Sequence, residues 1–163
     1  MSFAKRGCVV LFVLLASSSA SFAQRVAVLR DVRAIQVDPT FVANPDKVKE
    51  EFAANLMQDS LRNALRSANF ETPESATVKA HIVLDEFSSG SAAKRLLVGF
   101  GAGRSTVDAR LVFQDVDGNE LANVRIRVRG NLIWSAYQGG NAQRAQATNS
   151  FDRRLLEEIA RLK

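Results

Sequence analysis

The residues around Asp117-Gly118 constrain the fold more than any other part of this sequence. Aspartate followed by glycine is typical of a two-residue hairpin turn. If Val116 pairs with Asn119, one face of the hairpin carries only apolar pairs: Leu111 with Val124, Ala109 with Ile126 and Val107 with Val128. A shift of one residue would mix apolar and polar side chains on both faces. We therefore predict two antiparallel strands in this register.

The same register gathers basic side chains on the opposite face. Asp108 falls opposite Arg127, and Arg110 falls opposite Arg125, with Arg129 further along the second strand. One interpretation is a solvated face that Asp108 partly neutralises. The other is an anion-binding or docking surface, because arginine suits carboxylates, phosphates and interfaces. The candidate anion-binding residues are the four arginines of this face: Arg110, Arg125, Arg127 and Arg129.

Apolar periodicity predicts two helices. The first runs from about Pro45 to Ala68, with Asn44 as its N-cap and Asn69 as a left-handed terminator. The second runs from Ser150 to Leu162, where four apolar residues share one stripe: Phe151, Leu155, Ile159 and Leu162. The polar segment near residues 138–148 is predicted to be a mobile loop.

Two further strands complete the predicted fold. Residues 32–37 read as one strand that Pro39 ends, and the alternation from Val78 to Asp85 gives another. A strand, a helix and a strand in succession favour a crossover that sets the two strands parallel. We expect an α+β fold with a mixed four-stranded sheet, in the order strand-helix-strand-strand-strand-helix, and both helices on one face.

The first 23 residues read as a signal peptide. Lys5 and Arg6 precede an apolar run, and a small-residue cleavage site ends at Ala23. A retained membrane anchor is the alternative, but spanning a bilayer takes about 18 apolar residues or more. We expect a periplasmic or secreted protein in which residues 24–163 form one domain without cysteine. Cleavage removes two basic residues and no acidic one, so the formal net charge falls from +5 to +3.

A glycine-rich segment, residues 92–104, offers a second candidate surface. Three alternate glycines interrupt an apolar run between basic clusters. One interpretation is a buried, bent strand entry; the other is an exposed loop that docks on a partner or a membrane surface. The candidate partner-binding residues are the basic and apolar side chains of this segment: Lys94, Arg95, Leu97, Phe100 and Arg104. Nucleotide binding is disfavoured, because a strand and not a helix follows the glycines.

Catalytic and metal sites are hard to build from this sequence. His81 is the only histidine, and Asp85 and Glu86 are neighbours that a regular strand would point to opposite faces. The acidic residues from Asp115 to Glu120 suit a tight turn better than a calcium loop. Nucleic-acid binding is disfavoured because no stacking aromatics accompany the basic residues. We expect no enzyme activity, no metal and no cofactor.

Three segments carry a resemblance to a known family. The run from Leu29 to Arg33, the Asn44-Pro45-Asp46 sequence and the glycine-rich run from Ala93 to Ser105 resemble the domain of unknown function 4410 family of bacterial cell-envelope proteins. The resemblance implies an exported, often lipid-anchored α+β domain with no assigned activity. This chain departs from it in lacking a cysteine at the end of the leader, which puts membrane anchoring in doubt.

These observations together predict an exported, non-enzymatic accessory or interaction protein of the bacterial cell envelope. The expected partners are another envelope protein or further copies of this chain, with peripheral contact to a membrane or the cell wall. The alternative is a periplasmic module that binds a small molecule, an anion or a glycan through the arginine face. A third interpretation is a cryptic hydrolase, which would lose turnover on substitution of His81, Asp85 or Glu86.

Overall fold

A computed structural model describes residues 28–48, 51–88, 105–130 and 140–163. The predicted signal peptide and the partner-binding candidates Lys94, Arg95, Leu97, Phe100 and Arg104 lie outside these residues. The elements, in chain order, are β1 (Ile35–Val37), β2 (Phe41–Val42), the 3₁₀ helix η1 (Pro45–Lys47), α1 (Ala53–Ser67), β3 (Val78–Ser88), β4 (Thr106–Asp115), β5 (Glu120–Arg129) and α4 (Gly140–Leu162).

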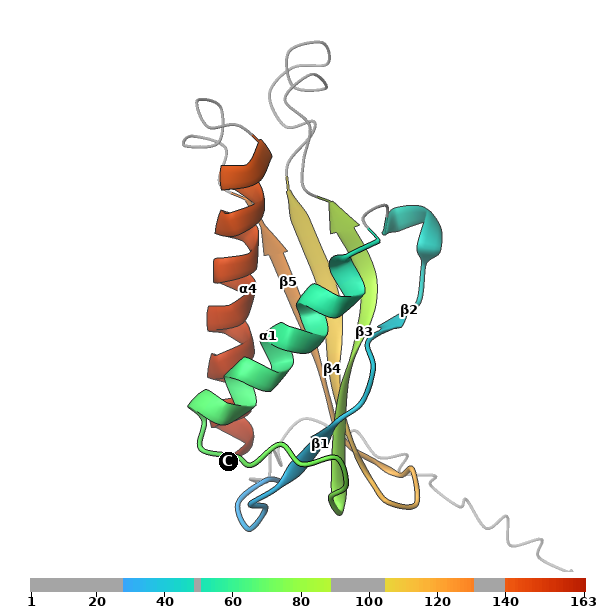
Figure 1. Ribbon diagram of the computed structural model, residues 1–163, viewed down its shortest axis with the longest axis vertical. Coiled ribbons are helices and arrows are strands. Elements are labelled where there is room, and N and C mark those ends of the chain that lie inside the picture. The colour runs from blue at the N-terminus through green and yellow to red at the C-terminus, as the bar shows by residue number, and fades with distance from the viewer. Residues whose placement is uncertain (1–27, 49–50, 89–104, 131–139) are drawn as a thin grey trace, which may run out of the picture.

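The described strands form one mixed five-stranded sheet. β1 and β2 both pair in parallel with β3, one after the other along the same edge, and β3, β4 and β5 follow as antiparallel neighbours (Figure 1). The parallel pairing of the first strand with β3 is as predicted. The prediction of four strands missed β2, because the chain resumes pairing at Phe41 after Pro39 interrupts it.

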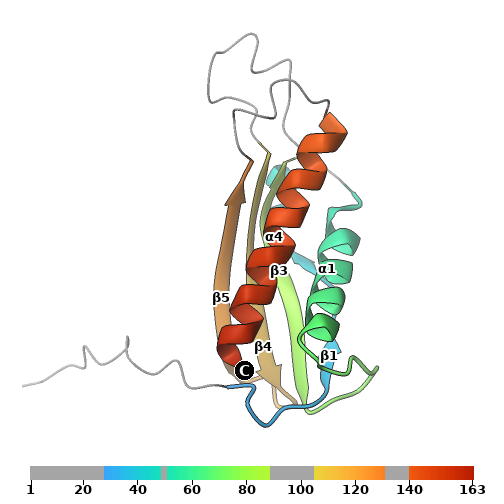
Figure 2. The same cartoon turned by 90° about the vertical axis from the view of Figure 1, so that its left-hand side faces the viewer.

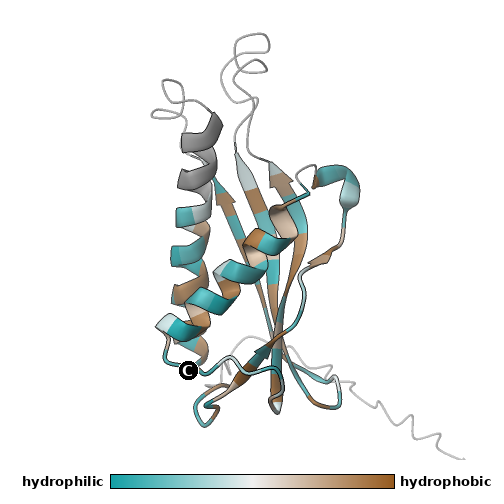
Figure 3. Cartoon of the chain, viewed as in Figure 1, coloured by the Kyte–Doolittle hydropathy of each residue, from teal (hydrophilic) through white to brown (hydrophobic). Residues whose placement is uncertain are grey.

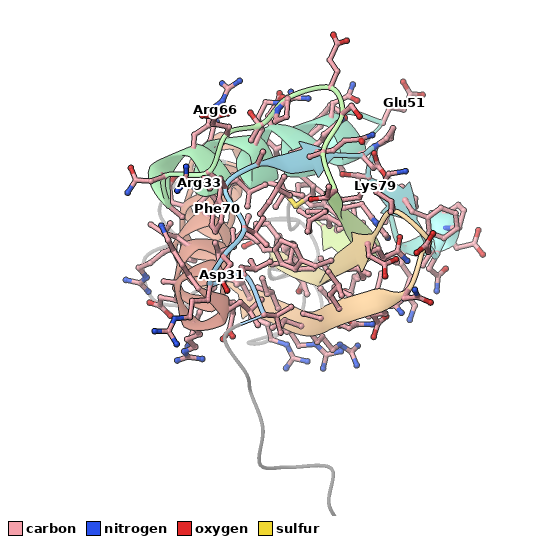
Figure 4. The ribbon with its side chains drawn as sticks, turned by 90° about the horizontal axis from the view of Figure 1, so that it is seen from below. Asp31, Arg33, Glu51, Arg66, Phe70 and Lys79 are labelled. Atoms are coloured by element: carbon pink, nitrogen blue, oxygen red, sulfur yellow. The ribbon has the colours of Figure 1, made fainter. Side chains whose placement is uncertain are left out.

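Both helices cover the same face of the sheet, as predicted (Figure 2). Apolar side chains of β3, β4 and β5 meet the apolar stripes of α1 and α4 in a single core, and the alternation of hydropathy along the strands is visible in Figure 3. The four stripe residues predicted for α4 are buried: Phe151, Leu155, Ile159 and Leu162. Neither α1 nor α4 covers the second face, which we call the open face. Seen along the strands in Figure 4, nitrogen-tipped side chains project from β5 on that face.

The predicted register of the β4–β5 hairpin is confirmed from Thr106 to Phe113. The turn itself differs: Val116 does not pair with Asn119. The N–H of Gly118 instead donates to the Asp115 carbonyl at 3.1 Å, and Gly118 has φ +83°. A longer turn with a left-handed glycine therefore replaces the two-residue turn, and a bulge beside Phe113 restores the register.

The start of the first helix was predicted wrongly. Pro45–Lys47 form only a 3₁₀ turn, without a side-chain hydrogen bond from Asn44, and α1 begins at Ala53. Val48 explains the break, because it is extended and bridges to Phe87 of β3. The end of the helix is as predicted: Asn69 has φ 63°, and the N–H of Phe70 donates to the Leu65 carbonyl at 3.0 Å.

The second helix is longer than predicted. α4 begins at Gly140, so residues 140–148 are helical and not the mobile loop expected near 138–148; residues 138–139 lie outside the described segments. The glycine and asparagine of this segment favoured a loop, yet most of its other residues are alanine, glutamine and arginine, which are good helix formers.

Among the described residues, no helix is long and apolar enough to cross a membrane.

Candidate functional site

A β-bulge in β3 turns two neighbouring carboxylates to the same side of the sheet. Leu84 pairs with Ala109, but the next pair is Glu86 with Asp108, so Asp85 is an extra residue on β3. Because the bulge interrupts the alternation of side chains, Asp85 and Glu86 both reach the open face. The prediction that these two residues point to opposite faces is therefore wrong.

Asp108 is the most deeply placed charge of the open face. Its side chain is only 3% exposed, and both of its oxygens accept hydrogen bonds from arginines of β5. Arg125 binds it with two parallel bonds, Nε to Oδ1 and Nη2 to Oδ2, each 2.9 Å long. Arg127 donates from Nε to Oδ2 at 2.7 Å and also from Nη2 to the same oxygen. One buried carboxylate therefore holds two guanidinium groups side by side.

A second ion pair lies next to this cluster. Arg110 of β4 donates from Nε and Nη2 to the two oxygens of Asp85, each at 3.0 Å. These parallel bonds fix the plane of the guanidinium group. Arg110 lies opposite Arg125 in the register, as predicted. The bulge thus supplies the carboxylate that neutralises Arg110, while Asp108 serves the two arginines of β5.

The electrostatics of the cluster favour its charged form. The hydrogen bonds from Arg125 lower the pKa of Asp108 below its ordinary value, against the opposing effect of burial, and Arg127 lowers it further. The pKa of Arg125 is raised in turn, chiefly by its hydrogen bonds to Asp108. Asp108 therefore stays ionised at neutral pH and is poorly suited to donate a proton.

A pocket of about 440 Å³ opens above these ion pairs. Asp85, Glu86, Asp108 and three arginines form its floor. The residues after β2, Ala43 and Asn44, form a wall together with Lys47 at the end of η1. Of the lining residues only alanine is apolar. Within the described residues neither Lys47 nor Glu86 has an ion-pair partner, so both charges are available to a ligand.

The structure brings three of the four predicted anion-binding residues into this pocket: Arg110, Arg125 and Arg127. Arg129 is exposed and pairs with Thr106 in the register, outside the pocket. Sequence reasoning missed Lys47 and Asn44, whose place depends on how the chain crosses the sheet edge after β2. It also missed Asp85 and Glu86, since nothing in the sequence marks the bulge.

Arginines bind two of the three carboxylates that line the pocket. Asp85 and Asp108 give both of their carboxylate oxygens to arginines, and His81 lies outside the pocket, opposite Val112 in the register. The described residues hold no group of three side chains that could bind a metal ion. The arrangement is suited to binding an anionic group through positioned guanidinium and ammonium donors.

The lowered pKa of Asp108 predicts how the cluster responds to acid. A carboxylate with a depressed folded-state pKa stabilises the fold above its unfolded-state pKa, about 3.9, and loses that contribution as the pH falls through its folded-state pKa. We expect the wild-type protein to be more stable than Asp108→Asn at pH 6, and this difference to shrink as the pH falls below about 4. Urea unfolding of both proteins from pH 7 to pH 3 measures it. A difference independent of pH would contradict the ionised cluster.

The sequence matches one family model, described as Domain of unknown function (DUF4410), over residues 29–130. No curated protein matches it. Among solved structures, the chain is similar to two PelC dodecamers from Paraburkholderia phytofirmans. One of them carries a single leucine-to-methionine substitution; it has 12% identity and a TM-score of 0.55, with 79% of this chain and 85% of that chain covered. The other has 13% identity and a TM-score of 0.55, with 77% of this chain and 87% of that chain covered.

Protein XCC0632 from Xanthomonas campestris, of the family DUF330, is also similar, at 12% identity and a TM-score of 0.55, with 78% of this chain and 81% of that chain covered. At these identities the likeness establishes a shared fold.

Proposed function

This chain belongs to the family described as Domain of unknown function (DUF4410), and we propose that it is an exported, non-enzymatic interaction domain of the bacterial cell envelope. The observation that carries the proposal is the charged pocket on the open face of the sheet. A helix layer covers the other face, so the open face is the broad surface that the described fold leaves for a partner.

The chemistry of the pocket supports binding over catalysis. Burying the carboxylate of Asp108 costs free energy unless its charge is paired, and the two arginines that pair it are thereby held in place. Such fixed donors recognise an acidic group without first having to be ordered. A hydrolytic site would need a carboxyl group that gives up a proton near neutral pH, whereas the pKa of Asp108 is shifted the opposite way.

The leader supports export to the periplasm, and the chain after Ala23 has no cysteine that an oxidising compartment could modify. Assembly of several copies is part of the proposal. Two solved structures of this fold are PelC dodecamers. An assembly of several copies would present the open-face pocket many times to one partner, which raises the overall strength of binding without any new contact.

Crosslinking in cells followed by affinity purification tests the proposal. The wild type is compared with Arg127→Glu, which reverses a charge in the pocket, and with Arg154→Glu on α4, where the side chain is 56% exposed and remote from the open face. We expect Arg154→Glu to retain the crosslinked species of the wild type and Arg127→Glu to lose it. Circular dichroism and thermal melting establish that each variant is folded. Equal recovery with both folded variants would contradict binding through the open face.

A further inference from the structure

We propose that the open-face pocket binds an acidic sugar, meaning a saccharide that carries a carboxylate or phosphate group. This inference rests on the proposed function, because it names the ligand class of the same surface. Three features of the described residues carry it: the unbalanced charge of the arginine pair, the size and polarity of the pocket, and an exposed aromatic ring at its side.

The acid group is recognised by Arg125, Arg127 and Lys47. Arg125 and Arg127 share the single negative charge of Asp108, so one positive charge of this trio is left over. Each guanidinium group uses Nε and Nη2 for Asp108, which leaves Nη1 free to donate elsewhere. Lys47 of η1 also lines the pocket and adds a third positive charge to it. An incoming carboxylate or phosphate would therefore meet guanidinium and ammonium donors in one pocket.

The size and lining of the pocket indicate a polar body attached to that acid group. A volume of about 440 Å³ is far larger than a lone anion needs and lies in the range of pockets for small organic ligands. Asn44 offers an amide that both donates and accepts, and Glu86 offers carboxylate oxygens that accept. These groups suit hydroxyls. An aliphatic ligand would leave them desolvated and unpaired, at a cost in affinity.

An exposed phenylalanine lies beside the polar wall. Phe41 of β2 is 63% exposed and pairs with Val83 of β3, which in turn pairs with Arg110, so all three side chains share the open face. Ala43 follows Phe41 by two residues, a spacing that sets side chains of an extended chain on the same face, and Ala43 lines the pocket. Among the large apolar side chains of the described residues, Phe41 is the most exposed. A flat ring next to hydroxyl-binding groups suits the C–H face of a sugar ring.

Isothermal titration of the purified mature protein tests the inference at low salt. The probes are oligogalacturonate, which carries carboxylates, and glucose 1-phosphate, together with neutral galactose oligomers, acetate and inorganic phosphate. We expect at least one acidic sugar to bind roughly tenfold or more tightly than its neutral counterpart and than the free anion. The acidic probe that binds more tightly shows whether the acid group of the ligand is a carboxylate or a phosphate. Added salt should weaken the binding.

Variants tie the binding to the pocket. Lys47→Gln leaves the Asp108 ion pairs intact and is expected to weaken acidic-sugar binding several-fold, as is Arg127→Gln, while Arg154→Gln on α4 should leave it unchanged. Phe41→Ala should weaken binding of the sugar but not of inorganic phosphate. Equal binding of neutral and acidic sugars, equal binding of sugar and free anion, or no binding at all would overturn the inference.

The crosslinking experiment distinguishes failure of this inference from failure of the proposed function. Loss of the crosslinked species in Arg127→Glu, without acidic-sugar binding, would leave the open face as a partner surface and reject the ligand class alone. Retention of that species in Arg127→Glu would reject the surface itself.

Discussion

Replacing Leu155 with alanine is expected to lower the free energy of unfolding by about 3 kcal/mol, because the change removes buried methyl groups and leaves a cavity between α4 and the sheet. Leu155 is fully buried in the core that joins the helices to β3, β4 and β5. The neighbouring Leu156 is 38% exposed and provides a matched control with the same chemical change. Its replacement by alanine should cost less than about 1 kcal/mol.

Urea unfolding monitored by circular dichroism measures both variants. A loss of stability in Leu156→Ala as large as that in Leu155→Ala would contradict the packing of α4 on the sheet. The comparison matters for the open face, because the position of α4 decides which side of the sheet is covered.

Replacing Asp108 with alanine is expected to cost about 2 kcal/mol of stability, because it removes the charge-assisted hydrogen bonds of a buried carboxylate. It also leaves Arg125 and Arg127 close together with no negative charge between them. Both arginines are about half exposed, so water recovers part of the loss, and the cost stays below that of breaking a fully buried pair.

The control for this prediction is Asp59→Ala on α1. Asp59 is 68% exposed and pairs with Arg62 at 3.4 Å, and surface pairs of this kind contribute at most about 1 kcal/mol. Thermal and urea unfolding of the two variants measure the difference. We also expect Asp108→Ala to weaken acidic-sugar binding, since the guanidinium groups lose their fixed positions. Equal stability of the two variants would show that the Asp108 cluster contributes no more to the free energy of unfolding than a surface ion pair does.

The sequence predicted the covered face of the sheet well, because burial enforces its pattern. Residues of β4 and β5 alternate between apolar and polar, and the register follows once one face must be apolar. The stripe of α4 was predicted for the same reason. The turn was predicted less well, since Asp117-Gly118 suits both a two-residue turn and the longer turn with a left-handed glycine that the chain adopts.

The open face was predicted only in part. The register placed Arg110, Arg125 and Arg127 together with Asp108, and the structure confirms that grouping. The role of Asp85 could not be predicted, because a bulge in β3 depends on its pairing with β4 and has no mark in the sequence.

The wall of the pocket depends on a tertiary contact. The Asn44-Pro45-Asp46 sequence carries ordinary helix-start signals, and these predicted a longer helix. The bridge between Val48 and Phe87 holds the segment against the edge of the sheet instead, and places Lys47 over the open face. Pairing with β3 therefore overrides the local preference of this segment for a helix.

The measurement that most directly tests binding through the open face is site-specific photocrosslinking in cells. A photoreactive side chain is placed either at Asn123, which is exposed on β5 and pairs with Val112, or at Leu156 on the outer side of α4. We predict crosslinked species from position 123 and none from position 156. Crosslinks from position 156 alone would contradict the account and assign binding to the helix layer.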